Sequence, residues 1–125
     1  MTELAYPDVA DAQDICERLQ LHVRDVGSLA SALARPGQVV WGVEAYVGIH
    51  RKAAALLDAI NRSHPLQDGN KRLSILLVML FYVLNGYVLT VDPDEGDRYI
   101  RQVGGDTHLE LEDTAAGLEQ RARQV

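Results

Sequence analysis

Apolar residues recur at steps of three and four over residues 9–21, 27–34 and 43–61, the spacing of one buried face of an amphipathic helix. Asp8 and Asp25 lie at the start of the first two segments and can cap them. An almost unbroken apolar run occupies residues 73–84 and predicts a helix over about 69–84 that is surrounded by other helices. The pattern therefore predicts one core helix packed among amphipathic ones.

The segments between and after these helices have a different composition. Residues 38–42 mix β-branched and aromatic side chains between glycines, which favours an extended loop or small hairpin, here called the flap. Within it, Trp41 suits a half-buried packing residue as well as one that faces a substrate. Asn85-Gly86 predicts the end of the core helix, followed by a short extended stretch at 87–91. Further helices are expected over about 93–103 and 111–125, giving an all-α domain of five or six helices with at most one small β element.

Bulk properties narrow the classes of protein. The 125 residues, 47% of them hydrophobic, suffice for a single domain over residues 1–125. The net charge of −6 disfavours a general nucleic-acid binder and confines any anion binding to a small cationic site. Cys16 and His50 lie on inward helical faces and are interpreted as packing residues. The N-terminus does not resemble a secretory signal, and the apolar run is shorter than the ~20 residues that span a bilayer, so a cytoplasmic protein without a membrane span is expected.

Nine residues directly before the apolar run carry most of the reactive chemistry: His64-Pro65-Leu66-Gln67-Asp68-Gly69-Asn70-Lys71-Arg72. The expected helix start at Gly69, Asn70 and Lys71 offers free backbone amides to an anion, and Lys71 and Arg72 add positive charge. Asp68 can hold Mg²⁺ between phosphates, and His64 can accept a proton from an attacking hydroxyl. This combination predicts a phosphate site beside a general base.

A purely structural interpretation of the same residues assigns Asp68 to an N-cap, His64 to a turn, and Lys71 and Arg72 to solvated surface. Each of two cations in a first helical turn destabilises the helix by some tenths of a kcal/mol, because its charge is unfavourable at the positive end of the helix dipole. A bound phosphate therefore explains these cations better. The loop is not a Walker A loop, because the Gly-x-x-x-x-Gly-Lys-Ser/Thr pattern is absent.

The motif resembles the signature of the Fic/Doc family, in which Fic members read His-Pro-Phe-x-Asp/Glu-Gly-Asn-Gly-Arg and Doc members read His-x-Phe-x-Asp-Ala-Asn-Lys-Arg. Residues 23–36 also look like the segment that precedes the flap in Doc (death-on-curing) toxins, so the resemblance covers roughly residues 21–91. It implies a helical Fic fold that binds a nucleoside triphosphate. By this resemblance His64 is the general base, Asp68 holds Mg²⁺, Asn70 shapes the anion site and Arg72 binds phosphate.

Three positions bear on the reaction that the resemblance implies. Lys71 matches Doc toxins, for which the resemblance implies transfer of the γ-phosphate of ATP, whereas Fic adenylyltransferases usually have glycine there. Gly69 matches the Fic pattern instead, and Leu66 replaces the usual phenylalanine as a smaller apolar plug. No self-inhibitory Ser/Thr-x-x-x-Glu-Gly/Asn motif is found, since Thr90 to Glu95-Gly96 is one residue too long and contains Pro93. Silencing by a separate antitoxin protein is therefore expected.

These observations leave three hypotheses. The first is a Doc-like toxin of a toxin–antitoxin module that uses ATP and Mg²⁺ to phosphorylate a hydroxyl of a translation-related protein, with elongation factor Tu as the expected kind of target. The second is a Fic-type adenylyltransferase, which transfers AMP. The third is a catalytically silent module that acts by binding a partner.

Overall fold

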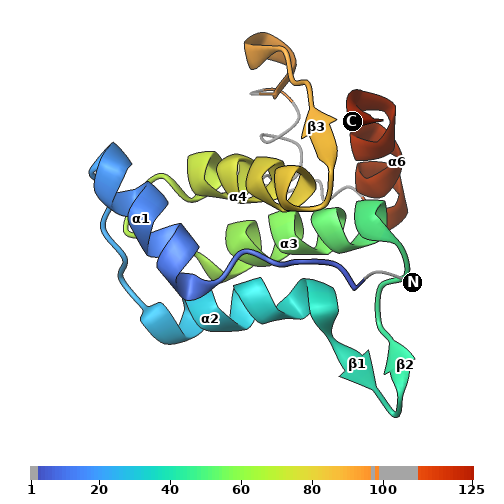
Figure 1. The fold of residues 1–125 in the computed structure, drawn as a ribbon. Helices are drawn as coiled ribbons and strands as arrows, with labels where there is room; N and C mark the ends of the chain where they lie inside the picture. Colours follow the sequence, from blue (N-terminus) through green and yellow to red (C-terminus); the bar gives the residue numbers. More distant parts are fainter. Residues whose placement is uncertain (1–2, 97, 99–109) are drawn as a thin grey trace.

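The computed structural model describes residues 3–96, 98 and 110–125, and this part of the chain is mostly helical (Figure 1). The all-α class is confirmed, but the described residues contain two small two-stranded sheets where at most one β element was expected. The helices are α1 (Val9–Leu19), α2 (Val26–Ala34), α3 (Ile49–Ser63), α4 (Asn70–Leu84) and α6 (Leu111–Arg121), with a short 3₁₀ turn, η1 (Arg35–Gly37), after α2.

The first two helices begin where the caps were expected. Asp8 accepts a hydrogen bond from the amide of Asp11, whose carboxylate accepts one from the amide of Asp8, which is a capping box. Asp25 accepts hydrogen bonds from the amide and hydroxyl of Ser28 at the start of α2. Both predicted caps are confirmed, and each fixes where its helix enters the fold.

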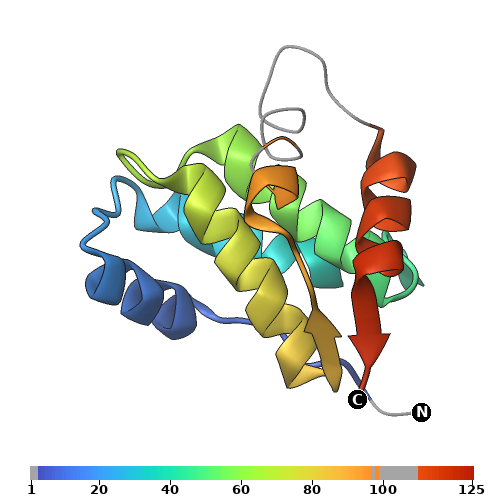
Figure 2. The ribbon, with the colours of Figure 1, turned by 90° about the horizontal axis from the view of Figure 1, so that it is seen from above.

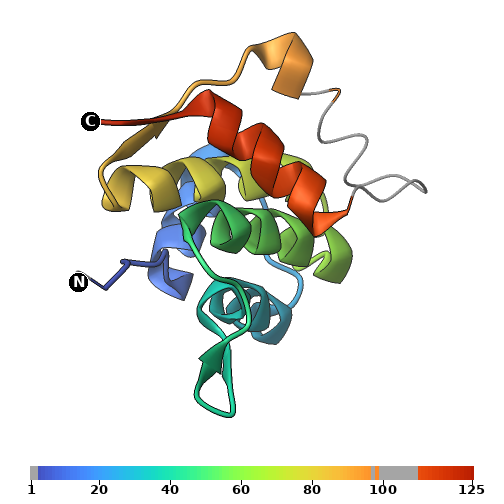
Figure 3. The same cartoon turned by 90° about the vertical axis from the view of Figure 1, so that its right-hand side faces the viewer.

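Helices α3 and α4 run antiparallel through the centre of the molecule (Figure 1). Helix α3 lies between α2 and α6 (Figure 3), and α4 packs against α3 and α1 (Figure 2). The core is formed mainly by buried aliphatic and aromatic side chains of α3 and α4, including Leu57, Ile60, Leu73, Leu77, Phe81 and Tyr82. The expected core helix is thus confirmed, although its last turn exposes Val83 and Leu84.

The flap is an antiparallel hairpin of β1 (Val39–Val40) and β2 (Val43–Glu44), as the composition predicted. Trp41 and Gly42 form its tip with φ angles of 53° and 75°. The prediction that the third helix begins at residue 43 is wrong, because residues 43–44 pair with β1 and α3 starts only after Gly48, whose φ is 90°. The helix start was predicted too early because Val43, Tyr46 and Val47 lie at positions that continue the apolar spacing of α3.

The C-terminus also differs from the prediction. Helix α6 ends at Arg121, and residues 122–124 form β4 (Ala122–Gln124), which pairs antiparallel with β3 (Tyr87–Leu89) (Figure 2). Arg123 therefore lies in a strand and does not end a helix. The extended stretch after Gly86 was predicted, but its partner lies over 30 residues away and was not.

The helix expected over 93–103 is only partly within the described residues. Residues 93–96 are helical and agree with its start. The apolar spacing of this segment also predicts Tyr99, Ile100 and Val103 on its inward face, but these three residues lie outside the described part. Among the helices of the described residues, none is long and apolar enough to cross a membrane.

Candidate active site

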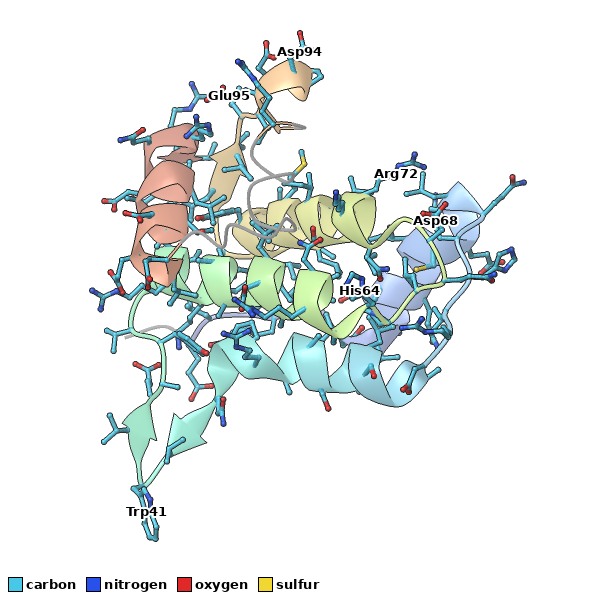
Figure 4. The ribbon with its side chains drawn as sticks, turned by 180° about the vertical axis from the view of Figure 1, so that it is seen from behind. Trp41, His64, Asp68, Arg72, Asp94 and Glu95 are labelled. Carbon is cyan, nitrogen blue, oxygen red and sulfur yellow. The ribbon has the colours of Figure 1, made fainter. Side chains whose placement is uncertain are left out.

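The nine-residue motif connects the end of α3 to the start of α4. His64 is the C-cap of α3 and adopts a left-handed conformation, with φ 47° and ψ 59°. Gly69 is the N-cap of α4 and is also left-handed, with φ 88°. Figure 4 shows His64, Asp68 and Arg72 at this same end of the α3–α4 pair. The structure therefore brings the predicted base, carboxylate and cation together at one helix junction.

Leu66 anchors this loop in the core. Its side chain is 1% exposed, and Pro65 beside it is buried too. The backbone of Leu66 forms an isolated antiparallel bridge with Val23. The prediction that Leu66 serves as an apolar plug is confirmed.

The loop backbone is held by a segment 40 residues earlier in the chain. The amides of Arg24 and Asp25 both donate to the carbonyl of Pro65, at 2.8 and 3.1 Å. The amide of Gln67 donates to the carbonyl of His22 at 3.1 Å. In addition, Nη2 of Arg24 donates to the carbonyl of His64 at 2.6 Å. These hydrogen bonds between residues 22–25 and the motif loop are here called the clamp. The sequence did not predict the clamp, because Asp25 was interpreted only as a helix cap and Arg24 was given no role.

Asn70 shapes the loop from inside the motif. Its Oδ1 accepts from the amide of Leu66 at 2.9 Å, and its Nδ2 donates to the carbonyl of the same residue at 3.1 Å. The amide side chain thus closes the turn between Leu66 and α4. This contact gives Asn70 a part in forming the predicted anion site through the backbone.

Among the described residues, no side chain caps the start of α4. The first turn of this helix also contains no acidic residue. Asp68 accepts a hydrogen bond from the amide of Gly69 at 2.9 Å, which lies outside the first turn. Lys71 and Arg72 are exposed, and neither forms an ion pair with any described residue. Positive charge therefore accumulates at an already positive helix terminus.

Asp68 is the only carboxylate that the motif offers to a metal ion. The described residues contain no group of three or more histidine, cysteine, aspartate or glutamate residues that could hold one. Mg²⁺ commonly keeps one or two protein carboxylates and takes its other ligands from phosphates and water. The exposed carboxylate of Asp68 fits that role when a nucleotide supplies the remaining oxygens.

A set of hydrogen bonds around the buried residues Asn61 and Ser74 connects α3 to α4 close to the junction. Nδ2 of Asn61 on α3 donates to Oγ of Ser74 on α4 at 2.9 Å and to the carbonyl of Leu57 at 2.8 Å. Ser74 in turn donates to the carbonyl of Lys71 at 2.7 Å. These hydrogen bonds link α3 to the first turn of α4, so they fix the start of α4 relative to the end of α3, where His64 is the C-cap.

The flap is attached to the other end of α3. Lys52, which is 3% exposed, contacts Glu44 of β2 at 3.1 Å. Arg35 donates to the hydroxyl of Tyr46 at 2.8 Å and pairs with Asp58 at 2.7 Å. These contacts hold the base of the hairpin, while its tip projects from the fold (Figure 1).

Trp41 at the flap tip is 98% exposed, so its interpretation as a half-buried packing residue is wrong. Figure 4 shows Trp41 at the projecting tip of the hairpin, well away from His64 in the helical body. Cys16 is buried, as expected of a packing residue. His50 is partly buried and its Nδ1 lies 2.9 Å from the hydroxyl of Tyr82, which also agrees with packing.

Glu95, which was considered as part of an inhibitory motif, lies away from the junction (Figure 4). It forms an ion pair with Arg121 of α6. Its contact is thus with the C-terminal helix and not with the cations of the motif.

Comparison with known proteins agrees with these features. The model of the Fic/DOC family matches residues 5–82, which include the clamp, the flap, the motif and most of α4. The chain is also 45% identical over 95 residues to the protein named Toxin Doc of Mycolicibacterium smegmatis, covering 75% of this chain and 73% of that protein. This chain therefore belongs to the Fic/DOC family.

Proposed function

We propose that this protein is a Doc-like toxin that transfers the γ-phosphate of ATP to a hydroxyl of a translation-related protein, such as an elongation factor Tu-like target. The observation that carries the proposal is the uncapped start of α4, where Lys71 and Arg72 have no carboxylate partner among the described residues. An anionic ligand would relieve this unfavourable charge arrangement, and a triphosphate supplies the matching charge.

Each residue of the motif named below has a separate role in such a transfer. His64 accepts the proton of the target hydroxyl as its oxygen attacks the γ-phosphorus, and the bond from that phosphorus to the β-phosphate oxygen breaks to leave ADP. The amides of the first turn of α4, with Lys71 and Arg72, stabilise the negative charge on the phosphates. Asp68 would hold Mg²⁺, which neutralises charge on the phosphates when bound.

Lys71 supports phosphoryl transfer over adenylyl transfer. In the Fic/Doc signature this position is glycine in the adenylyltransferases and lysine in Doc, and a lysine side chain here occupies space and adds charge beside the phosphate site. Gly69, which matches the Fic pattern, does not weigh against this, because it is explained by the local backbone. Its φ is 88°, and a Cβ there would lie 2.7 Å from Cδ2 of Leu21.

The relative named Toxin Doc supports a toxin role for this chain. We propose that a separate antitoxin protein binds and silences it. In the part of the chain that the structure describes, no acidic side chain contacts Lys71 or Arg72, so neutralisation by a partner is consistent with the free cations.

The reaction is tested by incubating the purified protein and a bacterial cell extract with ATP labelled at either the γ- or the α-phosphate. Label transferred to protein from the γ position alone is the expected result. Transfer from the α position alone would establish adenylylation and contradict the kinase proposal. His64→Ala should abolish transfer, while Arg18→Ala, in an exposed ion pair on α1, should leave it unchanged.

The toxin role is tested by inducing expression in bacteria. Growth should stop with the wild-type protein and continue with His64→Ala at equal protein levels. Equal growth arrest by both proteins would instead indicate a catalytically silent module that acts by binding.

A further inference from the structure

We infer that Arg24 is a positioning residue for the reaction: its guanidinium holds the carbonyl of His64 and thereby fixes the direction of the catalytic imidazole. This inference rests on the proposed function, because it takes His64 as the general base. Arg24 lies outside the signature motif, in the connection between α1 and α2.

The backbone carbonyls of residues 64–66, three consecutive residues of the motif loop, each accept at least one hydrogen bond. The carbonyl of Pro65 accepts from the backbone amides of Arg24 and Asp25, and that of Leu66 accepts from Nδ2 of Asn70. The carbonyl of His64 accepts from Nη2 of Arg24 at 2.6 Å. Among the described residues, Arg24 is thus the one whose side chain holds this loop from outside the motif.

His64 needs such a restraint because its backbone is left-handed, with φ 47°. For a residue with a Cβ this conformation costs about 1–2 kcal/mol and persists only where surrounding contacts enforce it. The amide of His64 donates to the carbonyl of Ile60 at 3.2 Å, which continues α3 up to this residue. Arg24 holds the following carbonyl, so the two contacts bracket the Cα from which the imidazole projects.

Arg24 is itself placed by its neighbours. Its own amide is bound to Pro65, and Asp25 caps α2 through Ser28. The hydrogen bonds that Ser28 donates to the carboxylate are the main cause of a lowered pKa of Asp25, with a smaller contribution from the charge of Arg24. The guanidinium therefore projects from a backbone that is fixed on both sides. Because the side chain is exposed, its removal leaves the core intact.

The expected effect is on turnover more than on stability. Without the guanidinium the His64 carbonyl can rotate, and a small displacement of a catalytic group lowers the rate by up to about 100-fold. Nucleotide binding at the start of α4 does not use this contact, so the KM for ATP should change little. Lysine can offer one donor to the carbonyl, so Arg24→Lys should retain more activity than Arg24→Ala.

The experiment measures kcat, KM for ATP and thermal stability for the wild type, Arg24→Ala, Arg24→Lys and the control Arg18→Ala. We expect kcat to fall about 10- to 100-fold in Arg24→Ala and less in Arg24→Lys, with the KM for ATP within about twofold of wild type. Added guanidinium, at concentrations that leave the wild type folded, should restore part of the activity of Arg24→Ala and none of His64→Ala.

Three results would overturn the inference: an unchanged kcat in Arg24→Ala, a raised KM for ATP with kcat retained, or loss of activity that only follows loss of folded protein. If the wild type transfers neither phosphate nor AMP, the proposed function fails instead. The clamp is then still tested by NMR of the free protein, where Arg24→Ala should shift the backbone signals of His64 and Leu66 more than those of α6. Equal shifts throughout the chain would refute the clamp.

Discussion

Gly69 and Leu21 are in such close contact that a side chain at position 69 cannot be accommodated without movement. A Cβ on Gly69 would lie 2.7 Å from Cδ2 of Leu21, and the φ of Gly69 is 88°. The left-handed backbone therefore favours glycine at position 69, and an added Cβ would also force the side chain of Leu21 to move.

Gly69→Ala is expected to destabilise the protein by about 1–3 kcal/mol, because it combines left-handed strain with overpacking. The free energy of unfolding in urea measures this. Gly86→Ala is a matched control, since Gly86 has φ 81° but no atom within 4 Å of an added Cβ, so this variant should show the cost of the strain alone. Adding Leu21→Ala to Gly69→Ala should remove the clash, and equal losses at positions 69 and 86 would argue against it.

The buried hydrogen bond between Asn61 and Ser74 is expected to couple α3 to α4. Asn61→Ala leaves Oγ of Ser74 with one partner fewer and should cost about 1–3 kcal/mol. A double-mutant cycle with Ser74→Ala should give a coupling energy of at least about 0.5 kcal/mol. Additive losses would mean that the two side chains act independently. Transfer activity should fall in both variants, because they free the first turn of α4.

Stability at acid pH should depend on Asp58. Burial raises the pKa of Asp58, but hydrogen bonds from Arg35 and Arg62 outweigh this effect and leave the pKa below its usual value. A carboxylate with a lower pKa in the folded state stabilises the protein above its unfolded pKa of about 3.9. That stabilisation is lost as the pH falls through the folded pKa.

Asp58→Asn should therefore flatten the fall in melting temperature between about pH 5 and pH 2 relative to the wild type. The control is Asp14→Asn, which removes an exposed carboxylate paired with Arg18 on α1. An Asp58→Asn variant with the same pH dependence as the wild type would show that the two arginines do not stabilise the ionised carboxylate.

Trp41 is the single tryptophan of the sequence and is almost fully exposed, so it reports on the flap tip alone. Its fluorescence in the folded protein should resemble that of the urea-unfolded chain, and acrylamide should quench both about equally. Trp41→Ala should change the free energy of unfolding by less than about 0.5 kcal/mol. A blue-shifted emission in the folded protein would show that the tip is covered.

A protein partner that binds the flap would also become visible through Trp41. Val40 and Val43 beside it are exposed and are paired across the hairpin, so a partner that binds the flap would contact them as well. Addition of a binding partner should then shift the emission to shorter wavelength, whereas a partner that binds elsewhere should leave it unchanged.

Much of the fold could be predicted from local pattern. The spacing of apolar residues located α1, α2 and α4 to within a residue or two, because each helix has a stripe that must be buried. The caps Asp8 and Asp25 were predicted correctly, since capping depends on residues three positions away. The chemistry of the motif was also identifiable, because its residues are consecutive.

The incorrect boundaries have a common physical cause. Tyr46 and Val47 continue the spacing of α3, yet the hairpin and Gly48 decide where the helix starts. Residues 122–124 could extend α6, but the free backbone groups of β3 offer a better partner. In both cases a contact with another strand overrode a weak helical preference, and no local pattern contains that information.

The sequence by itself determined the helical class, the position of the core helix and the set of reactive residues, because these depend on periodicity and on neighbours within one turn. Tertiary structure alone decided that Arg24 meets His64, that Leu21 lies where a Cβ on Gly69 would be, and that Asn85 binds the backbone of Ala5. These contacts join residues 40 to 80 positions apart. They form only when packing of the helices brings the segments together, so the order of residues along the chain could not reveal them.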